Sequence, residues 1–252
     1  MASTALQTVF NRDSSVRAPH LVSSNCESTS WAANTSLGTL SADTLRELES
    51  IMSIADYAAG DNLFLEQESL NRVFVVLAGD VRLSLQDIGG KRLTLRIVCR
   101  GTVLGVSEAF SGNLCEWSAD ILYPSRIASI KRNDFVRFAE RHPEVYRLAT
   151  MELIRTCSYT CRTLRILGLT YCVRKKLGGQ LLAWAEQGNR TGDQSRYRLA
   201  MSHAQIAEFI GTTRESVSRT LADFKRSGLV EFRGSMVTIP SMASLRDHVE
   251  RR

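Results

Sequence analysis

Residues 202–239, which read SHAQIAEFIGTTRESVSRTLADFKRSGLVEFRGSMVTI, decide the fold of this chain. They predict two short helices around a tight turn, followed by a small β-ribbon. Ser202 can cap the first helix, because Gln205 stands three residues further on as its capping-box partner. Gly211 then breaks the helix where φ can be positive, and Thr213 can cap the second helix. This order of elements is typical of a helix-turn-helix.

The second predicted helix has an apolar side and a polar side. Val217, Leu221 and Phe224 recur at offsets of four and seven, so they are expected to face the interior. The polar side holds Arg214, Glu215, Ser218 and Arg219. Charged and hydroxyl side chains at the start of such a helix are suited to reading base edges in the major groove of DNA.

A wing hairpin is predicted after the second helix. Residues 229–232 and 236–239 are short apolar runs joined by Arg233-Gly234-Ser235. The alternative is an amphipathic helix pair that binds nothing, but the small Ala207 at the helix crossing favours the DNA-binding motif. Hydroxyl and guanidinium groups around the motif are expected to contact phosphates. They belong to Thr212, Thr213, Ser202, Arg233 and Ser235.

The positive charge of the chain is concentrated on the same segment. The 252 residues carry a formal net charge of +6. From Tyr171 onward there are 14 Lys and Arg against 8 Asp and Glu, so the whole excess lies in this part. A phosphate-binding surface requires such an excess. A solvated basic face is the simpler reading, but the coincidence with the motif favours DNA.

Several classes of protein are excluded by what the sequence lacks. No apolar run approaches the ~18 residues of a membrane span, and no secretion signal opens the chain. A cytoplasmic location without a membrane partner is expected, with the six cysteines as thiols. No nucleophile–base pair or metal-ligand spacing is found, and Gly101 and Gly105 lack the Lys and Ser or Thr of a phosphate-binding loop. The chain is therefore not expected to be an enzyme.

The part before the motif changes character along its length. Residues 1–36 are rich in Ser, Thr, Asn and Ala and predict a flexible arm. Residues 41–51 predict a short amphipathic helix. Residues 54–130 form short alternating runs between turns, one of them at 78–80, which predicts an antiparallel sandwich. Residues 188–193, rich in Gly, Asn and Asp, predict a loop.

A long helix is predicted from about Pro143 to Leu169. Its apolar and small positions are separated by alternating steps of four and three, which is a heptad seam about three heptads long. The seam includes Leu153, Cys157, Thr160, Leu164 and Leu167. A parallel pair of such helices predicts a homodimer, which suits a helix-turn-helix protein on a palindromic site. The alternative is a helix that lies on its own domain.

The order of sandwich, seam helix and winged helix-turn-helix resembles the CRP/FNR superfamily of bacterial transcription regulators, over about residues 37–245. Residues 78–83, residues 101–105 leading into Ser118-Ala119, and residues 214–219 carry the resemblance. It implies an α+β fold with four parts. They are a flexible N-terminal arm (1–36), a β-roll sensor domain of cyclic-nucleotide-binding type (37–142), a dimerisation helix (143–170) and a winged helix-turn-helix domain (171–252).

The ligand segment departs from that family's cyclic-AMP-binding pattern. Those members hold the ribose with a Glu and the cyclic phosphate with an Arg, but Val106 and Trp117 stand at the matching positions here. A buried phosphate diester without its guanidinium loses on the order of 2–5 kcal/mol, so cyclic AMP is not expected as effector. The pocket implied by the resemblance is formed by Gly105, Val106, Ser107, Glu108, Trp117, Ser118 and Thr160.

Cofactors are not expected either. Oxygen-sensing members hold an iron–sulfur cluster with several cysteines near the N-terminus, whereas the arm here has only Cys26 and the sequence has no CxxC pair. The histidines lie outside the sandwich, which argues against haem; they are His20, His142, His203 and His248. Cys157 and Cys161 stand one helical turn apart, so a redox role stays open beside plain packing.

The sequence thus predicts a homodimeric, sequence-specific DNA-binding regulator that reads palindromic TGA-containing half-sites about one helical turn apart. Arg219 is expected to contact a guanine, Glu215 a cytosine amine, and Ser218 a thymine or phosphate. Arg214 is expected on a guanine or a phosphate. An activator of this type would also contact RNA polymerase. The alternative is a small-molecule or redox sensor that acts mainly through protein–protein contact.

Overall fold

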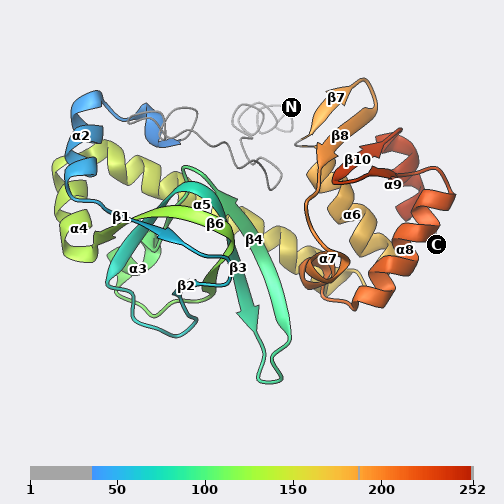
Figure 1. Ribbon diagram of the computed structural model, residues 1–252, viewed down its shortest axis with the longest axis horizontal. Helices are drawn as coiled ribbons and strands as arrows, with labels where there is room; N and C mark the ends of the chain where they lie inside the picture. The colour runs from blue at the N-terminus through green and yellow to red at the C-terminus, as the bar shows by residue number, and fades with distance from the viewer. Residues whose placement is uncertain (1–35, 187, 251–252) are drawn as a thin grey trace, which may run out of the picture.

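The computed structural model describes residues 36–186 and 188–250, which form two lobes joined by one long helix (Figure 1). The first lobe is a rolled sheet with short helices at one end, and the second is a helical unit with a small sheet. The predicted α+β class with a C-terminal helix-turn-helix is confirmed. The predicted arm, residues 1–36, lies outside the described residues apart from Ser36. No helix in the described ranges is long and apolar enough to cross a membrane.

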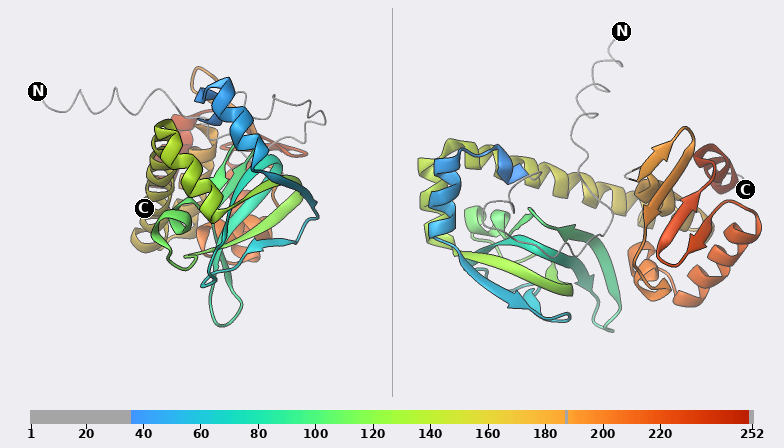
Figure 2. Two further views of the ribbon diagram at one scale, coloured as in Figure 1. Left: turned by 90° about the vertical axis from the view of Figure 1, so that its left-hand side faces the viewer. Right: turned by 45° about the horizontal axis from the view of Figure 1, so that its top comes forward.

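The N-terminal lobe is built on one antiparallel sheet that curves strongly (Figure 2). Its main path is β1-β6-β3-β4, while β2 pairs with β6 and β5 pairs with β3. The strands are β1 (Ser53–Tyr57), β2 (Asn62–Phe64), β3 (Arg72–Gln86), β4 (Arg92–Cys99), β5 (Val103–Leu104) and β6 (Ser118–Lys131). The helical segments of the lobe are η1 (Ser36–Thr39), α2 (Ala42–Ser50), α3 (Val106–Ser111) and α4 (Arg132–Arg141).

Two apolar clusters fill this lobe. One joins side chains of strands β2 to β6 and includes the stacked rings of Phe64 and Phe74, whose centroids are 6.0 Å apart. The other joins β3 and β6 to η1, α2, α4 and the start of the long helix, with Phe138 fully buried. Ser41 caps α2 as predicted, by accepting a hydrogen bond from the amide of Thr44.

The predicted turn at residues 78–80 is wrong. β3 runs straight through this segment, and its register against β6 shifts at Ala78 and again at Asp80. Gly79 has a φ of 90°, and a Cβ there would lie 2.0 Å from the Oγ of Ser125. Gly79 therefore allows a β-bulge and a close approach between β3 and β6. The bulge bends β3 but does not end it.

The long helix α5 (Pro143–Leu169) has the bounds that the sequence predicts. Pro143 occupies its first turn, where a missing amide hydrogen costs nothing. Val145 and Ala149 are buried against the sensor lobe, whereas most of the predicted seam is uncovered. Leu164 is 63% exposed and Leu153 42% exposed. An apolar row is thus left without a partner within the protomer.

The C-terminal lobe packs helices against a four-stranded antiparallel sheet of order β7-β8-β10-β9. Its helices are α6 (Val173–Ala185), α7 (His203–Ile210), α8 (Arg214–Arg226) and α9 (Met242–Glu250). Its strands are β7 (Asn189–Thr191), β8 (Gln194–Arg198), β9 (Glu231–Arg233) and β10 (Met236–Ile239). Their shared core is a single apolar cluster that includes Leu177, Ile210, Val217 and Phe224.

The predicted loop at residues 188–193 is a hairpin instead. β7 and β8 pair through Asn189–Arg196 to Thr191–Gln194, and Gly192 turns with a φ of 61°. All three residues of β7 are exposed, so an apolar alternation that would have predicted a strand is absent there. The hairpin extends the wing sheet by two strands.

Candidate nucleic-acid interface

The first helix of the motif is fixed by a complete capping box. The Oγ of Ser202 accepts from the amide of Gln205 at 3.2 Å, and Gln205 Oε1 accepts from the amide of Ser202 at 2.8 Å. The helix ends at Gly211, whose φ of 60° is left-handed. Thr213 then caps α8 by accepting from the amide of Ser216 at 3.3 Å. These three predictions are confirmed, and together they set the angle between the two helices.

The two sides of α8 differ as predicted. Val217, Leu221 and Phe224 are buried in the core of the lobe. Arg214, Glu215 and Arg219 are exposed on the other side. A straight helix with one side locked in the core presents the other side at a fixed orientation, which a base-reading element requires.

Glu215 is held ready to act as an acceptor. Its own backbone amide and the hydroxyl of Thr213 donate to the carboxylate and hold the pKa of Glu215 below its usual range. The carboxylate is therefore ionised at neutral pH, when it accepts hydrogen bonds and donates none. Arg219, one turn further along, donates from Nε to the carbonyl of Glu215 at 3.4 Å. The Arg219 side chain as a whole is exposed.

Ser218 differs from its neighbours because its partner lies on the other helix of the motif. The Nδ1 of His203, at the start of α7, lies 2.7 Å from the Oγ of Ser218. His203 is not among the DNA-contacting residues that the sequence predicts. One feature of the sequence could have indicated this role. His203 directly follows the Ser202 cap, and the first turn of α7 faces α8.

The predicted wing hairpin is present, but its first strand is Glu231–Arg233 and not 229–232, and one further residue, Arg198, contacts it. Gly234 turns between β9 and β10 with a φ of 59°, between Arg233 and Ser235. Arg198 on β8 donates from Nε to the Oγ of Ser235 at 3.1 Å. In the sheet, Met236 pairs with Arg198 on one side and with Arg233 on the other. Two guanidinium groups therefore flank the wing tip.

The residues of the predicted effector pocket are only partly brought together. Gly105, with a φ of 82°, begins α3, where Val106 and Glu108 are buried. Glu108 accepts from the Oγ of Ser107 at 2.8 Å. Trp117 packs against the apolar cluster of the roll.

The remaining two positions of that pocket have partners of their own. Ser118 accepts from the amide of Glu66 at 3.0 Å. Thr160 lies on the exposed side of α5, and its hydroxyl donates to the carbonyl of Thr156 at 3.0 Å. The predicted effector pocket thus presents apolar groups and a buried carboxylate, and it has no guanidinium at the position of Trp117.

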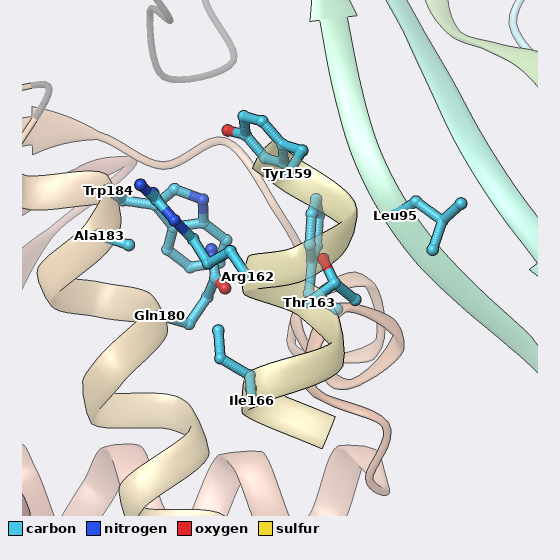
Figure 3. Close-up of a pocket in the computed structure, with 9 residues that line it drawn as sticks. Leu95, Tyr159, Arg162, Thr163, Ile166, Gln180, Ala183 and Trp184 are labelled. Carbon is cyan, nitrogen blue, oxygen red and sulfur yellow. The ribbon is translucent and has the colours of Figure 1, made fainter. Parts of the chain in front are cut away.

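Two other hollows lie beside α5. The first is apolar and is lined by η1, α2, β3, β5, β6, α3, α4 and α5, with Val106 of the predicted effector pocket in its wall. The carboxylate of Glu152 at its edge pairs with Arg96 at 2.8 Å. The second lies where β4, α5, α6 and α7 meet (Figure 3). Its wall includes Arg162, whose guanidinium lies 5.9 Å from the ring centroid of Tyr159.

Four cysteines of the described residues are free thiols: Cys115, Cys157, Cys161 and Cys172. Cys115 is buried, and burial raises its pKa to about 11. Hydrogen bonds from backbone amides at the start of α6 lower the pKa of Cys172. Cys157 and Cys161 are exposed on α5, and Cys26 lies outside the described residues.

The histidines stand apart from one another. His142 contacts Glu47, His248 lies edge-on to the ring of Phe224, and His20 falls outside the described residues. Within the described ranges no group of three or more His, Cys, Asp or Glu side chains is arranged to hold a metal. That neither haem nor an iron–sulfur cluster is bound stays a prediction.

The two lobes define a DNA-binding regulator that carries a sensor of cyclic-nucleotide-binding type. The cyclic nucleotide-binding domain family matches residues 54–142, and the Crp-like helix-turn-helix domain family matches residues 175–248. The chain belongs to the CRP/FNR family of transcription regulators, as its sequence resemblance implied.

Relatives in sequence are regulators as well. The nitrogen fixation regulation protein FixK of Bradyrhizobium diazoefficiens is 28% identical over 192 residues, which is 76% of this chain and 79% of that protein. The CRP-like cAMP-activated global transcriptional regulator of Mycobacterium tuberculosis is 26% identical over 185 residues, 73% of this chain and 82% of that protein.

Solved structures support the fold. A CooA mutant from Carboxydothermus hydrogenoformans superposes with a TM-score of 0.69 at 20% identity, covering 83% of this chain and 91% of that one. FixK2 from Bradyrhizobium japonicum gives a TM-score of 0.66 at 20% identity, covering 78% of this chain and 96% of that one.

Proposed function

We propose that this regulator binds palindromic DNA as a homodimer and reads TGA-containing half-sites with α8. The observation that carries the proposal is the exposed polar side of α8, where Arg214, Glu215 and Arg219 project from a helix whose other side is locked in the core. A guanidinium suits the O6 and N7 acceptors of guanine, and a carboxylate suits the amine of cytosine. The phosphates are contacted by Ser202, Thr212, Thr213, Arg233 and Ser235.

The proposed dimer forms along α5. Leu153, Cys157, Thr160 and Leu164 lie on its exposed side, and an apolar row of this length in water favours a partner helix. Leu167 has a second role, because its Cδ2 reaches within 2.9 Å of where a Cβ on Gly211 would lie. The end of the proposed seam therefore touches the turn of the helix-turn-helix.

The regulator is proposed to act without cyclic AMP. Val106 is buried, and Trp117 packs into the roll where the family's nucleotide-binding members place an arginine. A cyclic phosphate would then enter an apolar site beside the buried carboxylate of Glu108, which repels an anion. Neither an iron–sulfur cluster nor haem is part of the proposal, and the protein is proposed not to be an enzyme. An effector of other chemistry remains compatible with the fold.

Fluorescence anisotropy on a palindromic duplex with two TGA half-sites tests this function. We expect tight binding that weakens steeply with salt, because phosphate contacts release counterions, and that is unchanged by cyclic AMP. A duplex with both half-sites scrambled is the control. Binding that appears only with cyclic AMP would contradict the effector proposal, and equal binding to both duplexes would contradict sequence reading.

The second candidate is a sensor that acts mainly through protein–protein contact, with DNA binding secondary. The exposed apolar row on α5 and the exposed thiols of Cys157 and Cys161 favour it. The basic C-terminal lobe favours DNA instead. If the regulator is an activator, contact with RNA polymerase is also expected. A steep salt dependence of DNA affinity separates the two candidates.

A further inference from the structure

Three side chains connect the sensor lobe to the first helix of the DNA-binding motif. Arg82 on β3 donates to both carboxylate oxygens of Asp120 on β6, at 2.7 to 3.2 Å. Its remaining terminal nitrogen donates to Glu208 on α7 at 3.0 Å. The same oxygen of Glu208 accepts from the hydroxyl of Thr94 on β4 at 3.1 Å. We call Arg82, Thr94 and Glu208 the lobe bridge.

The lobe bridge is largely shielded from water. The side chain of Arg82 is 13% exposed and that of Glu208 is 28% exposed, while Thr94 is buried. Asp120, which Arg92 also approaches at 3.7 Å, already holds the guanidinium in place. The link to Glu208 therefore costs little further side-chain freedom, and partial burial makes it stronger than a pair on the open surface.

The segment before α7 is held by the same sheet. Tyr123 on β6 donates its phenol to the carbonyl of Ala200, two residues before the Ser202 cap. A third contact is apolar: Ile97 on β4 packs against the core of the C-terminal lobe. The hollow at the junction has Leu95 of β4 in its wall (Figure 3). Phe209 of α7 lines the same hollow. The sensor sheet thus holds α7 at both of its ends.

The docked side of the motif is not the side that reads DNA. Glu208 faces the sensor lobe, whereas Arg214, Glu215 and Arg219 on α8 are exposed. Docking therefore leaves the reading surface uncovered, which suits a role in orientation and not in masking.

We propose that Glu208 is a positioning residue for DNA recognition. Through Arg82 and Thr94 it holds the helix-turn-helix in one orientation relative to the sensor sheet. The inference rests on the proposed reading of DNA by α8. When the lobe bridge is broken, the motif samples other orientations, and the apparent affinity falls in proportion to the docked fraction that remains.

The test uses the full-length protein and the palindromic TGA duplex. If about one molecule in ten stays docked, Glu208→Ala raises the apparent Kd roughly tenfold. The slope of log affinity against log salt is expected to stay unchanged, because no phosphate contact is lost. Glu208→Gln keeps an acceptor for Arg82 and Thr94 and should restore part of the affinity. Glu186→Ala, at an exposed carboxylate after α6, is the matched control and should bind as wild type.

Two further readouts separate positioning from general destabilisation. Thr94→Val keeps the shape of a buried side chain and removes only its hydrogen bond. Its effect on affinity should be largely absent in the Glu208→Ala background, because both changes break one bridge. Amide hydrogen exchange should become faster in α7 and β4 of Glu208→Ala without DNA, and stay unchanged in α2 and α4.

An unchanged Kd in Glu208→Ala overturns the inference, and so does a shallower salt slope, which would make Glu208 part of the phosphate-binding surface. Fully additive effects of Thr94→Val and Glu208→Ala also overturn it. If the wild type binds no TGA duplex, the proposed function fails; faster exchange confined to α7 and β4 would then still support the bridge, and unaltered exchange would refute it.

Discussion

The imidazole of His203 and the hydroxyl of Ser218 lie 2.7 Å apart, so the first helix of the motif holds a side chain of the reading helix. Both groups can act as donor or acceptor. A neutral Nδ1 that accepts from Ser218 leaves the serine oxygen free as an acceptor. In the tautomer with the hydrogen on Nδ1, His203 donates instead, and the serine hydroxyl is then free to donate to DNA.

His203→Ala should therefore change how Ser218 reads its base. The freed hydroxyl rotates, so discrimination at the position it contacts is expected to weaken by about 1 kcal/mol, a typical net worth of one hydrogen bond. Anisotropy on duplexes altered one base pair at a time measures this. Adding Ser218→Ala to the His203→Ala protein should have little further effect at that position. A uniform loss over all duplexes would instead make His203 a phosphate contact.

Arg219→Ala tests the main base contact. Loss of a bidentate guanine contact should reduce the preference for TGA over a changed half-site by ~1–3 kcal/mol per half-site. Arg226→Ala is a suitable control, because Arg226 is an exposed cation at the far end of α8, where it pairs with Asp223. Equal discrimination in Arg219→Ala and wild type would contradict the assignment.

Periodicity predicted α2, α5, α7 and α8 well because the helical signal is local, whereas α3 and α9 were not predicted. The bounds of α5 and the caps Ser41, Ser202 and Thr213 followed from apolar spacing and hydroxyl placement. β3 was misjudged because Gly79 resembles a turn residue. Its bulge is decided by Ser125, 46 residues away, and no local pattern reports such a contact.

In the candidate site too, features that depend on local sequence were predicted, and features that depend on contacts between distant residues were not. Arg214, Glu215 and Arg219 were placed correctly on the exposed side of α8, since their position depends only on helical period. His203 and Arg198 were missed because their partners lie across the fold, at 15 and 37 residues in sequence. The lobe bridge joins residues more than a hundred positions apart, so it could not be predicted from spacing.

Leu164→Glu tests the dimer seam. Leu164 is 63% exposed in the protomer, so a charge there should leave the fold intact and place two carboxylates against each other across the axis. The expected result is a monomer with strongly reduced affinity for the palindrome, measured by sedimentation equilibrium and anisotropy. Ser158→Glu puts the same charge at an exposed position of α5 outside the heptad seam and should remain dimeric. A Leu164→Glu protein that still sediments as a dimer would place the interface elsewhere.

Asp80 makes the stability of the fold depend on pH. It is 6% exposed, its Oδ1 has no hydrogen-bond partner, and burial raises its pKa from 3.8 to about 6. Because the folded state holds this proton more tightly than the unfolded chain does, ionised Asp80 destabilises the fold above pH 6. That penalty is relieved as the pH falls from about 6 toward 4.

Asp80→Asn should therefore raise the free energy of unfolding at pH 8 by about 1–3 kcal/mol, and the gain should shrink as the pH approaches 4. The neighbouring groups Tyr123, Ser125 and Arg198 are unchanged in the variant, so the difference between the two proteins isolates one carboxyl group. Urea unfolding followed by tryptophan fluorescence measures it. Glu116→Gln, at an exposed carboxylate of the same lobe, should show no such pH-dependent difference. If Asp80→Asn and wild type differ equally at pH 8 and pH 4, the buried carboxylate is not the source.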